Sequence, residues 1–159
     1  MPALEDKFKH IRKLMVRNFI QWAIFMALSV MFLAISFWKQ DTLEMPGISQ
    51  LTLFAIIVVS LIFAHYFPAF LIQKAPFNYH NDNGRMFAYR AKLGVSLFLL
   101  LWVIITESFY IYAFGINKTL IALILFTLLK AYKLRPTKNV WVDFRMRYRA
   151  GRTMPVRSR

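Results

Sequence analysis

The 159-residue sequence contains no cysteine, which excludes disulfide scaffolds, thiolate-bound zinc, iron–sulfur clusters and covalently attached c-type haem. Acidic residues are also scarce: seven Asp and Glu stand against 21 Lys and Arg, for a formal net charge of +14. Only five glycines accompany sixteen phenylalanines, which excludes a collagen-like or disordered chain. Charged residues make up 18% and hydrophobic residues 58%, whereas a soluble domain carries about 25% charged residues. The composition indicates a small, basic, integral membrane protein.

Four apolar stretches alternate with charged ones, and we expect each to form a transmembrane helix in an all-α fold. The stretches cover about 19–38, 48–72, 93–114 and 117–134. A bilayer core needs about 20 residues of helix, which the first three supply directly. The fourth is short in its apolar part, because Lys118 and Lys130 bracket it. It spans the bilayer only if both lysine side chains extend toward the interfaces.

Basic residues fall almost entirely on one side of these stretches. The N-terminal segment holds five, the loop 74–92 four and the tail from Lys130 ten, whereas the other two connections hold one each. Because cytoplasmic loops are enriched in Lys and Arg, both termini and the loop 74–92 are predicted to be cytoplasmic. A re-entrant fourth segment would carry the basic tail across the membrane, so we expect four spans. We expect the membrane to be a bacterial inner membrane or an equivalent organellar inner membrane.

The first stretch has a second interpretation, a cleaved signal peptide, since basic residues precede it. Its apolar run is long, and Ala34-Ile35-Ser36 is a poor cleavage sequence followed by bulky Phe37 and Trp38. We therefore expect a retained signal-anchor.

Two cytoplasmic segments show patterns of their own. Residues 1–18 place apolar side chains at helical spacing, which predicts an interfacial amphipathic helix; the alternative is a cytoplasmic extension of the first span. In the loop 74–92, Asn83-Gly84 is a type I′ turn signal between apolar residues spaced by two. The tail repeats this period with Val142, Phe144, Met146 and Tyr148. We predict a small cytoplasmic β-hairpin or sheet from 74–92 plus 140–149; the alternative is irregular structure.

Glu107 is the sole acidic residue inside an apolar stretch, where a charged side chain costs about 2.5–3.5 kcal/mol. Ser60 of the second span falls at a similar depth, and Tyr110 lies one turn further on. These three are candidate ion- or proton-binding residues. The structural alternative, a protonated or hydrogen-bonded Glu107 that joins helices or pairs with another subunit's cation, is favoured because no second intramembrane acid completes a relay.

The basic tail 135–159 is expected to bind anionic lipid headgroups, at about 1 kcal/mol per nearby charge, or an acidic subunit. Its aromatic residues favour a docked surface, and no nucleic-acid partner is expected. The candidate binding residues are Arg135, Trp141, Phe144, Arg145, Arg147, Tyr148, Arg149 and Arg152.

No metal-binding, phosphate-binding or nucleophile motif occurs in the sequence, so we expect no metal, cofactor or enzymatic activity. Large side chains and few small-xxx-small pairs give little basis for a self-contained bundle. The leading hypothesis is a non-catalytic subunit of a hetero-oligomeric membrane complex, of the kind found in secretion or conjugation machinery, respiratory complexes and ATP synthases. The alternative is a small ion- or proton-conducting component that uses Glu107.

Overall fold

The computed structural model describes residues 2–39, 49–74 and 82–147, in which the chain forms five helices and no strand. The helices are α1 (Pro2–Trp38), α2 (Gln50–Lys74), α3 (Asp82–Phe114), α4 (Lys118–Lys133) and α5 (Lys138–Arg147). Helices suit a chain surrounded by hydrocarbon, because each satisfies its backbone N–H and C=O groups internally. The all-α prediction is therefore confirmed for these residues.

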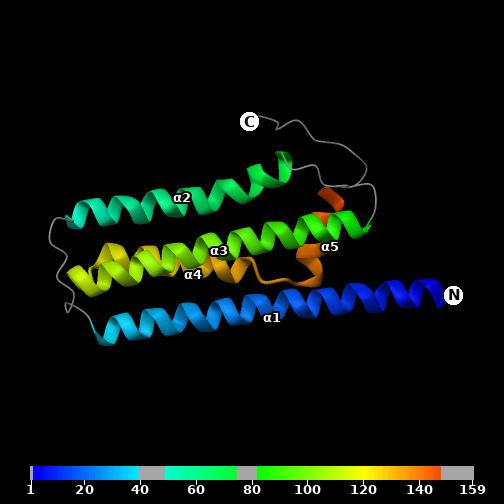
Figure 1. Cartoon of the computed structure of the whole chain (residues 1–159), viewed down its shortest axis with the longest axis horizontal. Coiled ribbons are helices and arrows are strands. Elements are labelled where there is room, and N and C mark those ends of the chain that lie inside the picture. Colours follow the sequence, from blue (N-terminus) through cyan, green and yellow to red (C-terminus); the bar gives the residue numbers. More distant parts are fainter. Residues whose placement is uncertain (1, 40–48, 75–81, 148–159) are drawn as a thin grey trace.

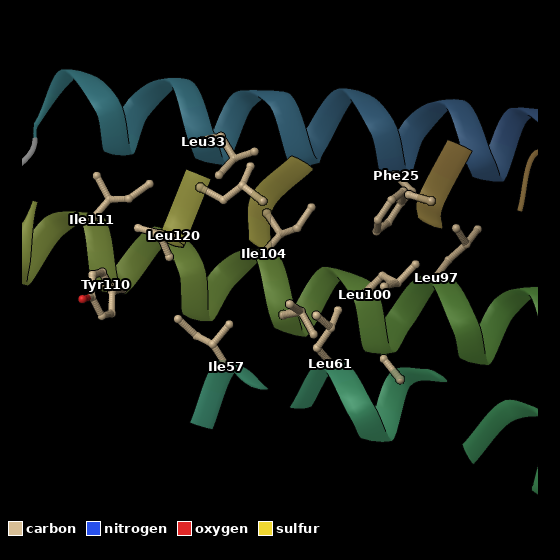
Figure 2. Close-up of a cluster of buried hydrophobic side chains, with 14 of the residues drawn as sticks. Phe25, Leu33, Ile57, Leu61, Leu97, Leu100, Ile104, Tyr110, Ile111 and Leu120 are labelled. Atoms are coloured by element: carbon tan, nitrogen blue, oxygen red, sulfur yellow. The ribbon is translucent and has the colours of Figure 1, made fainter. Parts of the chain in front are cut away.

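Helix α3 is the centre of the bundle and contacts each of the other four helices. α1 and α3 run in one direction, and α2 and α4 run in the opposite one (Figure 1). Figure 2 shows Phe25 and Leu33 of α1 pointing toward α3 from one side, and Ile57 and Leu61 of α2 from the other. Half of the most apolar 18-residue stretch of α3 is buried, compared with 22% for α1 and 28% for α2.

Three helical segments are long and apolar enough to cross a membrane, which makes the chain a multi-pass integral membrane protein. They are Arg12–Trp38, Gln50–Lys74 and Asn83–Phe114. α4 has 16 residues and spans about 24 Å, less than the roughly 30 Å of a hydrocarbon core.

α1 is one continuous helix from Pro2 to Trp38, as expected if the N-terminal segment extends the first span. Contact of residues 1–18 with the membrane interface stays a prediction.

Three residues reverse the chain between α3 and α4. Gly115 adopts a positive φ of 69°, and its N–H donates to the carbonyl of Ile111 at 3.0 Å, which ends α3. Asn117 then caps α4, because its side-chain oxygen accepts from the N–H of Leu120 at 2.7 Å. This short connection places α4 antiparallel to α3.

The predicted β-hairpin and tail strand are wrong wherever the structure describes them. Residues 82–92, including Asn83-Gly84, lie in the first turns of α3, and 140–147 belong to α5. The remaining parts of both predictions, 75–81 and 148–149, lie outside the described residues. A turn signal such as Asn-Gly is tolerated at a helix start, where the first N–H groups have no partner inside the helix.

Tertiary packing explains why these segments are helical. At the end of the bundle that carries α5, a second apolar cluster joins α2, α3 and α5; it comprises Ile72, Met86, Ala88, Tyr89, Trp141 and Phe144. Phe144 is 6% exposed but Met146 is 60% exposed, although a strand would place both on one face. Trp141 and Phe144, three residues apart, instead share one face of α5.

We expect Phe144→Ala to lower the free energy of unfolding in detergent micelles by about 3 kcal/mol, because it removes a buried ring. Met146→Ala is the matched control and should change this free energy by less than about 0.5 kcal/mol. Denaturant titration of both variants, followed by tryptophan fluorescence, makes the comparison. Equal losses would contradict the helical packing of α5.

Candidate functional site

Glu107 and Thr127 form a polar contact at the interface between α3 and α4. Both side chains are fully buried. The hydroxyl oxygen of Thr127 lies 2.9 Å from Oε1 of Glu107 and 2.9 Å from the carbonyl oxygen of Leu123. Oε2 of Glu107 has no hydrogen-bond partner in the described part of the chain. The carboxyl group is thus held at one oxygen only.

Most buried residues within one turn of this contact on α3 and α4 are apolar; the polar exceptions on α3 are Thr106 and Ser108. The buried face of α4 consists of Leu120, Ile124, Thr127 and Ala131, so Thr127 is its single hydroxyl. On α3, Val103, Ile104 and Ile111 lie about one turn from Glu107 and are fully buried. In an apolar interface, one polar pair favours the register in which its two members meet, because any other register leaves both unpaired.

The three predicted ion- or proton-binding residues do not come together. Ser60 is half-buried on α2, and the hydroxyl of Tyr110 has other partners. Thr127 takes their place, and the sequence analysis did not identify it. The sequence feature that could have identified Thr127 is its spacing: positions 120, 124, 127 and 131 follow one another at intervals of three or four residues and so share one face of a helix. Ion or proton conduction through Glu107 stays a prediction.

Tyr110 instead organises the end of the bundle at which α2 begins. Gln50 of α2 donates from its side-chain amide to the Tyr110 hydroxyl at 2.6 Å, and Asn117 donates at 2.8 Å. The Tyr110 ring is 1% exposed and packs edge-on against Phe54. Since Asn117 also caps α4, this cluster joins α2, α3 and α4.

His65 of α2 and Lys130 of α4 form another interhelical hydrogen bond, nearer the opposite end of the bundle. Nζ of Lys130 lies 2.8 Å from Nδ1 of His65. At this distance one nitrogen donates a hydrogen and the other accepts it. The pair joins α2 and α4, which both pack on α3.

The start of α1, the end of α2, the start of α3 and all of α5 gather at one end of the bundle (Figure 1). We call this end, together with the end of α4 and its connection to α5, the basic end. Seven of its cationic residues are exposed, and none forms an ion pair within the described ranges; they are Arg12, Lys13, Arg17, Lys74, Lys133, Arg135 and Lys138. Their charge therefore faces the surroundings uncompensated.

Arg135 is held at this end by aromatic rings. Its guanidinium lies 5.4 Å from the centre of the Phe19 ring and 5.8 Å from that of Trp22, within cation–π range. The indole N–H of Trp22 donates to the carbonyl of Ala131 at 2.8 Å, which fixes α1 against α4. A guanidinium stacked on a ring keeps its N–H edge available for a phosphate or carboxylate.

The other predicted partner-binding residues lie in different settings. Trp141 and Phe144 are buried against Tyr89 within the chain, with ring centres 5.6 and 5.3 Å from that of Tyr89. A role for them in binding a partner stays a prediction and requires α5 to leave α3. Arg145 and Arg147 belong to α5. The last three, Tyr148, Arg149 and Arg152, lie outside the described residues.

Protein-family models, curated proteins and solved structures show no match to this chain, so its site is interpreted from its own residues.

We expect Tyr110→Phe to lower the free energy of unfolding by about 1–3 kcal/mol, because Gln50 and Asn117 lose the oxygen to which they donate. Tyr112→Phe is the control: Tyr112 is half-buried and has no side-chain hydrogen bond in the described structure. Thermal unfolding of both variants in the same detergent tests this, and equal stability of the two would contradict the role of the Tyr110 cluster.

Proposed function

We propose that this chain is a non-catalytic integral membrane subunit that crosses the membrane four times. Its basic end lies on the cytoplasmic side, where it binds anionic lipid headgroups and an acidic surface of a neighbouring subunit in a hetero-oligomeric complex. The exposed, unpaired cations of the basic end carry this proposal. They have no acidic partner among the described residues of the chain itself, so complementary charge is expected from outside it.

The height of α3 supports the fourth crossing. At one end Asn117 is hydrogen-bonded to Tyr110, and at the other Trp141 packs on Tyr89. The part of α3 from Tyr89 to Tyr110 spans about 32 Å, roughly the thickness of a hydrocarbon core. From Asn117 to Trp141 the chain returns over this same height, through α4 and the connection to α5. α4 by itself is shorter than the hydrocarbon core, but α4 and the connection to α5 together cover its height. A complete fourth crossing is therefore compatible with the short α4.

The charge distribution supports the orientation. Of the 17 Lys and Arg residues that the structure describes, fifteen belong to the segments at or near the basic end, whereas Lys39 follows α1 and Lys118 begins α4 at the other end. Lys and Arg are retained on the cytoplasmic side of membrane proteins. Each cation near an anionic leaflet also gains about 1 kcal/mol, so the same charges that orient the chain attract lipid.

The sides of the bundle support association within the membrane. Large apolar side chains are exposed on α1, α2 and α4, and even the central helix exposes a row of rings at Phe98, Trp102 and Phe109. These three recur on one face of α3. Such a surface contacts lipid chains or the helices of other subunits, which are equally apolar.

The absence of native cysteine allows a direct test of the topology. Single cysteines at Lys13, Ile116 and Lys138, all exposed, are labelled with a membrane-impermeant maleimide in sealed cells and in inverted vesicles. We expect positions 13 and 138 to react from the cytoplasmic side and position 116 from the other. The cysteine-free parent controls for background. Labelling of 13 and 138 from opposite sides would contradict four crossings.

Native mass spectrometry of the protein extracted from its own membrane in mild detergent tests the partners. We expect a stoichiometric second membrane protein and retained anionic lipid, with both released by high salt because exposed charges are screened. A chain that purifies alone at low salt and retains zwitterionic lipid as readily as anionic lipid would contradict the proposal.

A further inference from the structure

The number of hydrogens at the contact between Glu107 and Thr127 limits which oxygen can be the donor. The Thr127 hydroxyl oxygen has two oxygen neighbours at 2.9 Å, Oε1 of Glu107 and the carbonyl of Leu123. A hydroxyl carries one hydrogen and can donate it fully to one of them. The Leu123 carbonyl is four residues earlier in the same helix, which is the usual acceptor position for a buried threonine. A carbonyl oxygen can only accept, so the hydrogen in this second contact must come from Thr127. If Thr127 donates to Leu123, the hydrogen between Thr127 and Glu107 must come from Glu107.

The second carboxyl oxygen points to the same protonation state. Oε2 is buried and has no hydrogen-bond partner in the described part of the chain. A carboxylate in that position would leave half of its charge unpaired in a medium without water, which is far more costly than an unpaired neutral carbonyl oxygen. A carboxylic acid that donates through Oε1 leaves Oε2 as such a carbonyl oxygen.

We propose that Glu107 is a proton-binding site: at neutral pH it is a carboxylic acid whose O–H donates to the hydroxyl oxygen of Thr127 and so locks α3 to α4. This hydrogen bond between α3 and α4 also determines the positions of two cations toward the basic end. Thr127 lies one turn before Lys130 and two before Arg135 on the same stretch of chain, so fixing Thr127 on α3 also fixes where these two cations lie.

The neighbouring titratable groups do not replace this proton. Along α4, the nearest ionisable residue is Lys130, and its ammonium group is directed to His65 of α2 at 2.8 Å. On α3, Tyr110 lies one turn beyond Glu107, and its hydroxyl accepts from Gln50 and Asn117. On α1, which also packs on α3, no ionisable residue occurs between Arg17 and Trp38. Glu107 thus has no counter-charge within hydrogen-bonding distance in the described structure.

Infrared spectroscopy at pH 7 in micelles of a detergent without ester groups tests the proposal, because the C=O stretch of a carboxylic acid is separate from the bands of carboxylates. The other six acidic residues lie outside the apolar stretches and are expected to be ionised. The parent protein should therefore show one protonated-carboxyl band, which Glu107→Gln removes and Asp82→Asn leaves unchanged. Absence of the band in the parent, or its persistence in Glu107→Gln, would overturn the proposal.

A second pair of variants tests the hydrogen bond between the native glutamate and Thr127, and it remains decisive if Glu107→Gln fails to fold. Thr127→Val removes the acceptor and should move the band to higher frequency, whereas Thr127→Ser retains a hydroxyl and should leave the band in place. The same frequency in both variants would overturn the hydrogen bond from Glu107 to Thr127. The topology and partner experiments do not depend on this result, since they rest on the basic end.

Discussion

Hydrocarbon supplies no hydrogen bonds, and this single property of the surroundings constrains the interior of the bundle. The backbone satisfies itself by forming helices. Buried hydroxyls use the same solution: Ser29, Ser36 and Thr106 each donate to the carbonyl four residues earlier in their own helix. Such bonds add no contact between helices. The few polar groups that do reach across a helix interface therefore determine which helices meet and at what height.

Besides the Trp22 indole N–H that donates to Ala131 between α1 and α4, three such contacts are arranged from one end of the bundle to the other. The neutral cluster around Tyr110 closes the end where α2 begins, Glu107 and Thr127 join α3 to α4, and His65 with Lys130 joins α2 to α4 nearer the basic end. Most of the described Lys and Arg residues lie toward the basic end, and only Lys39 and Lys118 lie at the other end. A bundle with such an excess of cations at one end would be oriented by its own charge in a membrane with an anionic cytoplasmic leaflet.

The sequence prediction and the structure differ where a short segment was assigned the two-residue spacing of apolar side chains that is typical of a strand. Alternation over only seven residues, as at 142–148, fits a strand and is also compatible with a helix. The competing signal was the pair Trp141 and Phe144, whose spacing of three places both on one helical face. Burial against Tyr89, 52 residues earlier in the chain, decides between them. Long apolar stretches carried no such ambiguity, and three of the four predicted spans correspond to helices of sufficient length.

The sequence by itself determined the membrane class, the apolar stretches and the separation of positive charge, because these depend on composition and order along the chain. The partner of Glu107 was decided only by the tertiary structure: Thr127 is 20 residues away and on another helix. The same holds for His65 with Lys130 and for the helical α5. Helices packed side by side select contacts by depth and rotation about their axes, and neither quantity can be read from a linear sequence.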